Sequence, residues 1–195
     1  VKLCLDCIST IGAIKLDLKD VYLASGVSGK AIGAYTGLAF VFHQHPIKPN
    51  QTLPRYLDLG MYAKYDSIPY SHSSTMLDAL SEALNKYDET DYYKEIADRY
   101  WYIRNRIEEM GLSILTPPDI SSPAIMTVLL PSHISSKDIG DDMYLQGYLL
   151  HYESGYLQEK GWLQIACISR NDKKKIDKML NTFEELLKHY TAEKE

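Results

Sequence analysis

The sequence predicts an α/β fold in which strands and helices alternate along the chain. Short apolar runs such as "VKLCLD" and "GLAFVF" have the length and continuity of strands buried within a sheet. Other segments place apolar residues at spacings of three and four, which is the period of an amphipathic helix. A chain of 195 residues is long enough for one large domain or two small ones. We place a boundary inside the helical region, which gives domains at residues 1–90 and 91–195.

The first domain is predicted to hold a mostly parallel sheet. Strands are expected at residues 1–6, 20–25 and 37–42, with a short helix at residues 8–14. Their continuous apolar character is typical of strands that are covered on both faces. Residues 43–75 carry prolines, serines and tyrosines without periodicity, which predicts a long irregular segment of the kind that usually has a function.

Two helices follow and lead into a small C-terminal α/β domain. Apolar side chains on one face predict a helix from about Thr75, and a longer helix from residue 91 ends at Gly111. The remaining sequence predicts strands at residues 112–116, 124–131 and 162–168, and helices at residues 136–147 and 173–190.

Composition argues against two classes of partner. The net charge of −5 and the isoelectric point near 5.7 disfavour a nucleic-acid surface, which normally has a basic patch. No run of about 18 apolar residues is present, and the N-terminus lacks the basic flank and cleavage site of a signal peptide. We therefore expect a cytoplasmic protein that binds neither nucleic acid nor a membrane.

The three cysteines are expected to be structural. Cys4 and Cys7 form a C-x-x-C in a predicted strand, whereas a redox motif needs a helix N-terminus to lower the pKa of its thiol. Cys167 lies in an apolar run and is expected in the core. His43 and His45 have no nearby carboxylate or third ligand in the sequence, so no metal site is predicted.

A glycine-rich stretch, "ASGVSGKAIGAYTG", contains four glycines and Lys30 directly after a predicted strand. A nucleotide-binding phosphate loop needs G-x-x-x-x-G-K-[ST], but here Ala24 replaces the first glycine and Ala31 replaces the hydroxyl residue. The stretch favours instead a lysine nucleophile, whose amine forms a Schiff base in a confined position. Asp6 ends the preceding strand, and ligands bind at the carboxyl ends of strands in such sheets. Asp6 is therefore the expected partner of Lys30.

The segment from Leu3 to Phe42 resembles the core of the class V aminotransferases. These pyridoxal-phosphate enzymes include alanine-glyoxylate and serine aminotransferases and the cysteine desulfurases. The residues in step with the family pattern are Asp6, Ser9, Gly12, Ser28, Lys30 and Gly37-Leu38-Ala39. "SIPYSHSSTMLDALSEAL" and "WLQIACISRNDKKKID" are similar to later segments of the family. The resemblance implies a fold-type-I enzyme, of which this chain is the second half of the large domain followed by the small domain.

The resemblance assigns the cofactor chemistry to Lys30 and Asp6. Lys30 would form the Schiff base with the aldehyde of pyridoxal 5′-phosphate and then move protons between substrate and cofactor. Asp6 would keep the pyridine nitrogen protonated. Ile8 would pack against the ring, and Ser9 would reach the region of the ring hydroxyl.

The other implied contacts concern the phosphate and the substrate. Ser28, together with Ser25, would donate to the phosphate. Ser71 stands where the family has a threonine that reaches the phosphate of the neighbouring subunit, which implies a dimer. Tyr70 and His72 flank Ser71 and are expected to line the site for a small amine or amino-acid substrate.

The chain departs from the family in two ways. The family generally holds the substrate α-carboxylate with an arginine in the last strand, where this chain has Gln164. Either the substrate lacks an ordinary α-carboxylate, another arginine such as Arg170 replaces it, or the chain has lost amino-acid catalysis. Family members also have a long segment before the Asp6 strand, which supplies several sheet strands. Since a half sheet would expose unpaired edges, we expect a second polypeptide that carries the N-terminal half.

Two alternatives to an aminotransferase stay open. A cysteine desulfurase or carbon–sulfur lyase usually has a histidine before the lysine, where this chain has Gly29, and a desulfurase needs a cysteine on a mobile loop. A non-catalytic subunit that keeps the fold is compatible with Gln164, whereas the presence of both Asp6 and Lys30 argues against it. Transamination is the leading prediction.

Overall fold

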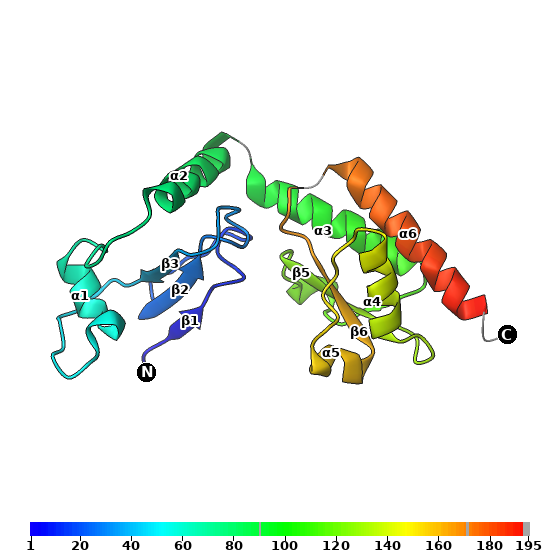
Figure 1. Cartoon of the computed structure of the whole chain (residues 1–195), viewed down its shortest axis with the longest axis horizontal. Helices are drawn as coiled ribbons and strands as arrows, with labels where there is room; N and C mark the ends of the chain where they lie inside the picture. Colours follow the sequence, from blue (N-terminus) through cyan, green and yellow to red (C-terminus); the bar gives the residue numbers. More distant parts are fainter. Residues whose placement is uncertain (90, 171, 193–195) are drawn as a thin grey trace. The chain divides into compact units, whose positions relative to one another are not determined.

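The computed structural model describes residues 1–89, 91–170 and 172–192. The chain divides into two compact units, Val1–Thr90 (unit 1) and Asp91–Glu195 (unit 2), and each has its own sheet (Figure 1). Helices accompany the strands in both units, so the predicted α/β class is confirmed.

Unit 1 contains a three-stranded sheet in the order β1 (Cys4–Asp6), β2 (Leu23–Val27) and β3 (Ala39–Phe42). β1 and β2 run parallel, whereas β3 runs antiparallel to β2. β3 can return in this direction because the segment after β2 forms turns instead of a crossover helix. Within the described residues, β1 and β3 each pair with one strand and form the two edges of this sheet.

The predicted helix at residues 8–14 is wrong, because these residues form turns. Gly12 has a φ of +83°, which lies outside the helical region. A Cβ at this position would lie 2.6 Å from the Tyr87 hydroxyl, so glycine permits both the backbone angle and the close approach.

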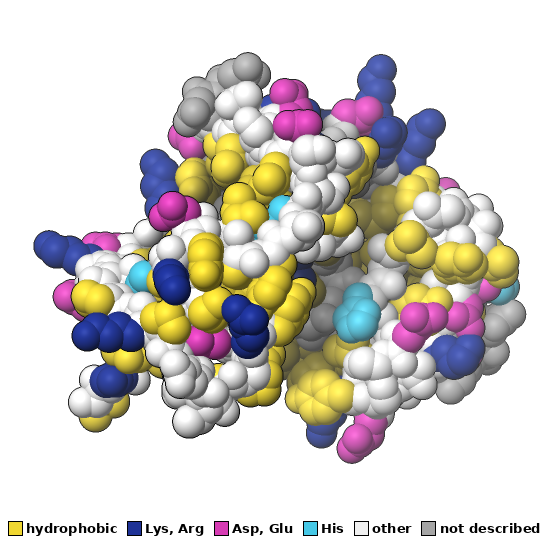
Figure 2. Space-filling model, turned by 60° about the vertical axis from the view of Figure 1, so that its left-hand side comes forward, with side chains coloured by type: hydrophobic (Ala, Val, Ile, Leu, Met, Phe, Trp, Pro, Cys, Tyr) yellow, Lys and Arg dark blue, Asp and Glu magenta, His cyan; other side chains and the backbone are white. Residues whose placement is uncertain are grey.

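The sheet of unit 1 is more exposed than its apolar sequence predicted. Its buried cluster consists of Cys7, Val21 and Ala24, and Leu5, Ile11, Leu16 and Leu18 pack against it half-buried. Val41 and Phe42 on β3 are 42% and 37% exposed, so the prediction of a sheet covered on both faces is wrong for the described chain. Hydrophobic side chains reach the surface over wide areas of the face shown in Figure 2.

The segment at residues 43–75 is less irregular than predicted. It contains a short 3-10 helix at Arg55–Leu57 and the helix α1 (Leu59–Lys64). The buried Asp58 carboxylate caps α1 by accepting from the Gly60 N–H at 2.9 Å, and it also accepts from the Asn50 N–H at 2.8 Å. The cap therefore ties the preceding loop to the helix, a contact that has no signal in hydrophobic periodicity. The last element of unit 1 is α2 (Ser74–Glu89), as predicted.

Unit 2 packs helices against a second three-stranded sheet. Its elements are α3 (Tyr92–Glu109), β4 (Ser113–Ile114), β5 (Ile125–Leu129), α4 (Ser136–Leu145), α5 (Gly155–Lys160), β6 (Trp162–Ala166) and α6 (Lys173–Ala192). The strands are antiparallel in the order β4-β5-β6. One buried cluster joins side chains of α3, α4 and α6 to both long strands, for example Tyr100, Met143, Phe183 and Leu163.

In the part of the chain that the structure describes, no helix combines the length and hydrophobicity needed to cross a lipid bilayer.

Candidate active site

Asp6 lies at the carboxyl end of β1, beside Ser25 of the parallel strand β2. One carboxylate oxygen, Oδ1, accepts hydrogen bonds from the Ile8 N–H at 3.0 Å and from the Ser25 hydroxyl at 3.1 Å. Among the described residues, Oδ2 accepts no hydrogen bond. The side chain is exposed, so it presents a fixed carboxylate with one free oxygen to any group that binds at this edge of the sheet.

Lys30 lies in the turn that follows β2, at the same edge of the sheet. Its Nζ donates to the Ser9 hydroxyl at 2.7 Å, and Ser9 follows β1 by three residues. The turn closes through a hydrogen bond from the Gly33 N–H to the Lys30 carbonyl at 2.9 Å. The parallel pairing of β1 and β2 thus brings Asp6, Ser9 and Lys30 to one edge, although they are far apart in sequence.

Ser28 holds the lysine turn from inside. The residue is fully buried, and its hydroxyl donates to the Tyr35 carbonyl at 2.6 Å and accepts from the Leu38 N–H at 3.3 Å. Its role in this structure is to fix the loop between β2 and β3. Ser25 donates its hydroxyl to Asp6, so the roles of Ser25 and Ser28 as phosphate ligands stay predictions.

Gly29 is required by the packing of the same loop. A Cβ at this position would lie 2.4 Å from Cγ2 of Thr36 and 2.9 Å from its Cα. A side chain at Gly29 would therefore fit only if the loop backbone around Gly29 and Thr36 moved. This close approach explains the glycine that precedes Lys30.

Tyr87 of α2 is not among the site residues that the sequence predicted. Its hydroxyl lies 2.9 Å from the Gly12 carbonyl oxygen and 2.6 Å from the Ala31 carbonyl oxygen. Tyr87 therefore links the turn after Asp6 to the turn that carries Lys30. Its position one helical turn beyond the buried Ala83 places it on the inner face of α2, which is the one signal that the sequence offered.

Tyr70, Ser71 and His72 lie in the exposed segment that precedes α2. The Tyr70 ring stacks on Tyr56 with 5.6 Å between centroids and meets Tyr62 edge-on at 6.1 Å. Within the described residues, no hydrogen bond connects Ser71 or His72 to Asp6 or Lys30. Their roles at the phosphate and substrate stay predictions.

Gln164 belongs to unit 2, in the middle of β6. Its side-chain amide donates to the Thr127 hydroxyl of β5 at 3.0 Å, and its backbone exchanges two hydrogen bonds with His151. Arg170 lies beyond the strand with its guanidinium carbon 4.2 Å from the centre of the Tyr92 ring. The amide of Gln164 is thus engaged within the sheet.

The thiols and histidines do not add a second reactive centre to this picture. Burial raises the pKa of the Cys167 thiol to about 12, so at neutral pH this thiol is protonated. Cys7 is buried as well, whereas Cys4 is exposed on β1. In the described ranges, no three His, Cys, Asp or Glu side chains are grouped to hold a metal ion.

No protein-family model matches the chain, and no curated protein matches it. Solved structures with the same fold include ureidoglycine-glyoxylate aminotransferase from Bacillus subtilis (TM-score 0.85, 19% identity, 98% of this chain and 54% of that one). Alanine-glyoxylate aminotransferase from Nostoc sp. follows with a TM-score of 0.79, 22% identity, and 96% and 54% coverage. A cysteine desulfurase from Thermococcus onnurineus gives a TM-score of 0.72 at 10% identity, with 97% and 53% coverage.

The chain spans about half the length of the solved structures that it matches. Nearly the whole of this chain aligns with that part of the solved structures, and the TM-scores of 0.85 and 0.79 show a shared fold. The chain therefore has the fold of the pyridoxal-phosphate-dependent transferases, of which it spans a part.

Proposed function

We propose that this chain is the lysine-bearing part of a pyridoxal-phosphate-dependent aminotransferase of the class V kind. The observation that carries the proposal is the meeting of Asp6 and Lys30 at one edge of the sheet, through the parallel pairing of β1 with β2. A carboxylate and an amine at this edge are the two groups that a pyridine ring with an aldehyde requires at its opposite ends.

The described residues fit such a cofactor. Asp6 is oriented by two donors on Oδ1, and its free Oδ2 can accept a hydrogen bond from a protonated ring nitrogen. Lys30 is exposed, with Ser9 as its described partner, so its amine is accessible to an aldehyde. Pyridoxal phosphate, when bound, supplies the electron sink that stabilises a carbanion at the substrate α-carbon.

Lys30 and Asp6 then have separate tasks. With the cofactor bound, Lys30 Nζ would hold it covalently and would carry the proton that leaves the substrate α-carbon. Ser9 accepts a hydrogen bond from Nζ and so limits where the amine can point. The Asp6 side chain would accept a hydrogen bond from the ring nitrogen and so favour the protonated ring.

Borohydride reduction followed by peptide mass spectrometry tests the assignment of Lys30. The wild-type protein, in its complete assembly, should carry a pyridoxyl group on the Lys30 peptide, and Lys30→Ala should carry none. Asp6→Asn can keep both hydrogen bonds on its side-chain oxygen, so it should retain the label and lose most turnover. A pyridoxyl group on another lysine, or an unlabelled wild type, refutes the proposal.

A desulfurase or carbon–sulfur lyase is the second candidate, since desulfurases share the fold. The structure offers this reaction little support. Cys7 and Cys167 are buried and Cys4 lies on a strand, so the described residues contain no cysteine on an exposed loop. A histidine before Lys30 would also collide with Thr36, as any Cβ at Gly29 does.

Because position 164 is a glutamine, we propose that no charged side chain at this position holds a carboxylate of the substrate. The amide carries no charge and is already hydrogen-bonded to Thr127. We expect Gln164→Arg to lower KM for ordinary α-amino acids with little change for the natural amino donor. An unchanged substrate preference would count against this role and favour either Arg170 or a non-catalytic subunit.

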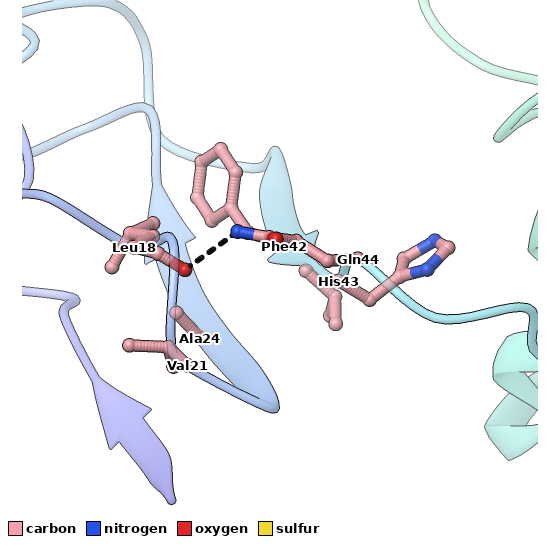
Figure 3. A pocket seen from close by; sticks show the side chains of 7 residues that line it. Leu18, Val21, Ala24, Phe42, His43 and Gln44 are labelled. Atoms are coloured by element: carbon pink, nitrogen blue, oxygen red, sulfur yellow. Dashed lines mark hydrogen bonds between the residues drawn. The ribbon is translucent and has the colours of Figure 1, made fainter.

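The proposal includes a polypeptide that carries the N-terminal half of the fold. The solved structures contain nearly as much chain again as this one, and within the described part of unit 1 the edge strands β1 and β3 each pair with β2 alone. Beside the sheet lies a cavity of about 370 Å³, lined largely by apolar side chains such as Leu18, Val21 and Phe42 (Figure 3). Apolar side chains of the N-terminal half would fill this cavity and cover β3.

An affinity tag placed after α6 in the native gene allows the native assembly to be purified and its molecular mass to be measured. The Lys30-bearing species should contain the additional half, either in the same chain or in a stoichiometric second chain. Phe42→Asp should destabilise or dissociate this assembly, whereas Leu149→Asp, at an exposed site in unit 2, should leave it intact. A monomer of the 195 residues alone that binds the cofactor contradicts this part of the proposal.

A further inference from the structure

A groove of about 670 Å³ in unit 2 has no predicted site residue in its lining. One wall is the segment from Leu130 to Lys137, which includes the start of α4. The other wall is the end of α5 from Gln158 to Gly161.

The first turn of α4 supplies unpaired backbone donors to this groove. Ser135 caps the helix, since its hydroxyl accepts from the Asp138 N–H at 3.2 Å and its carbonyl accepts from the Ile139 N–H. The N–H groups of Ser136 and Lys137 precede these donors and have no acceptor among the described residues. They lie at the positive end of the helix dipole.

Ser136 is an independent sign of a ligand at this place. The residue is 3% exposed and lines the groove, yet its hydroxyl makes no hydrogen bond among the described residues. In the described chain, every side-chain oxygen that is fully enclosed has a hydrogen-bond partner. Because the Ser136 hydroxyl has none in the described chain, it is not fully enclosed and lies at the small part of the residue that is exposed. The Ser136 hydroxyl is therefore accessible at the groove, where a bound acceptor can pair with it.

Charged side chains of both signs surround the groove, and Asp138 lies in the first turn of α4. Lys160 and His133 line the groove, and within the described residues Lys160 has no ion pair. Lys137 already pairs with Asp141, so its charge is partly used. Glu159 is the opposing carboxylate on the same groove.

We propose that this groove binds the phosphate group of a small phosphomonoester. Two backbone N–H groups, the Ser136 hydroxyl and the Lys160 ammonium would contact the phosphate oxygens, as donors at a helix N-terminus do. The groove is larger than a free phosphate ion, which leaves room for an organic group beside Leu130 and Ile134. The groove is lined by unit 2 residues and uses neither Lys30 nor Asp6, so the proposal does not rest on the proposed aminotransferase function.

Titration of the ¹⁵N-labelled 195-residue chain with glycerol 3-phosphate tests this site by NMR. Inorganic phosphate forms the second arm and sodium chloride at equal ionic strength forms the control. We expect saturable shifts of the Ser136 and Lys137 amides, with tighter binding of the ester than of inorganic phosphate. The N-terminus of α3, which is capped by Asp91, provides an internal control that should not respond.

Three variants distinguish a specific phosphate site from the general attraction of anions to a helix N-terminus. Ser136→Ala should weaken binding about tenfold, as expected for one hydrogen bond to a charged group. Lys160→Gln should weaken binding, whereas Glu159→Gln should strengthen it; thermal melts verify that each variant is folded. Absence of saturation, equal shifts at α3, or no effect of Ser136→Ala in a folded protein overturns the proposal, and tighter binding of inorganic phosphate assigns the site to the free ion instead of an ester.

Discussion

The Tyr87 hydroxyl connects two turns that each follow a residue of the candidate site. Its two carbonyl partners, on Gly12 and Ala31, lie 75 and 56 residues away in sequence. One turn follows β1, which ends at Asp6, and the other carries Lys30. We therefore predict that Tyr87 positions these two turns relative to each other.

Tyr87→Phe removes the hydroxyl and keeps the ring. We expect the free energy of unfolding to fall by about 1 kcal/mol, the usual contribution of a hydrogen bond. Covalent attachment of pyridoxal phosphate at Lys30 should slow by about tenfold, because small displacements of a reacting group are costly. Denaturant titration and the rate of cofactor attachment measure the two effects.

Tyr35→Phe is the matched control, since the Tyr35 side chain is 68% exposed and should change neither quantity. If Tyr87→Phe attaches the cofactor at the wild-type rate, Tyr87 has no positioning role.

Residues differ in how far the sequence can predict them. Asp6 and Lys30 could be paired in advance because each directly follows an apolar run and parallel strands end at a common edge. Tyr87 could not be paired with its partners because the contact joins a helix to distant turns. The buried hydroxyl of Ser28 was likewise beyond the pattern, since its acceptors depend on how the loop folds back.

At the scale of elements, α4 contains a glycine that is explained by packing. A Cβ on Gly140 would lie 2.4 Å from the ring of Tyr152, which is buried against the helix and donates to Asp141 at 2.7 Å. An alanine in a helix normally stabilises it relative to glycine by about 1 kcal/mol. Here the close contact with an aromatic ring opposes that gain.

We expect Gly140→Ala to lower the free energy of unfolding by about 1–3 kcal/mol, the usual cost of overpacking. Gly155→Ala is the matched control, because a Cβ at this position of α5 meets nothing within 4 Å, and it should be neutral or slightly stabilising. Thermal or denaturant unfolding decides between them. A stabilising Gly140→Ala would mean that the ring of Tyr152 moves aside freely.

Asp141 adds a pH dependence to the same element. Hydrogen bonds from Lys137 and from the Tyr152 hydroxyl hold the pKa of its carboxyl below the ordinary value of 3.8. The resulting stabilisation is present above that ordinary pKa and is lost as the pH falls through the lower pKa of the folded state. We therefore expect Asp141→Asn to be less stable than the wild type at pH 6, with a smaller difference at about pH 3. A difference that is constant with pH would contradict this origin.

Long helices were the most predictable elements, because α2, α3 and α6 repeat an apolar period over many turns. The six-residue helices α1 and α5 were missed, since each is too short to show a period and depends on a cap, Asp58 or Ser154. The false helix at residues 8–14 failed for a related reason. Its apolar spacing is helical, but the positive φ of Gly12 decides the local backbone.

At the scale of the whole molecule, the two units differ in how much apolar surface they bury. Among the described residues, the buried apolar side chains of unit 1 are mostly small, such as Ala13, Ala24 and Ala31, whereas those of unit 2 include Tyr100, Met143 and Phe183. Burial is the main source of folded-state stability, so the units should open with different free energies.

Native-state hydrogen exchange of the isolated chain measures this difference. We expect the amides of β5 and β6 to exchange at least about a hundredfold more slowly than those of β2. Addition of the N-terminal half should slow β2 selectively. Equal protection of the two sheets in the isolated chain would show that unit 1 is complete without a partner.

The buried hydroxyl of Ser28 also shapes the turn that carries Lys30. Since Ser28, Tyr35 and Leu38 close the loop within a single chain, the turn that carries Lys30 is shaped during folding of this segment. The conformational entropy of that turn is thus lost before any ligand arrives, which favours later binding. Under the proposed function, the turn that carries Lys30 would form first. The N-terminal half would then complete the site, and activity would appear only at that step.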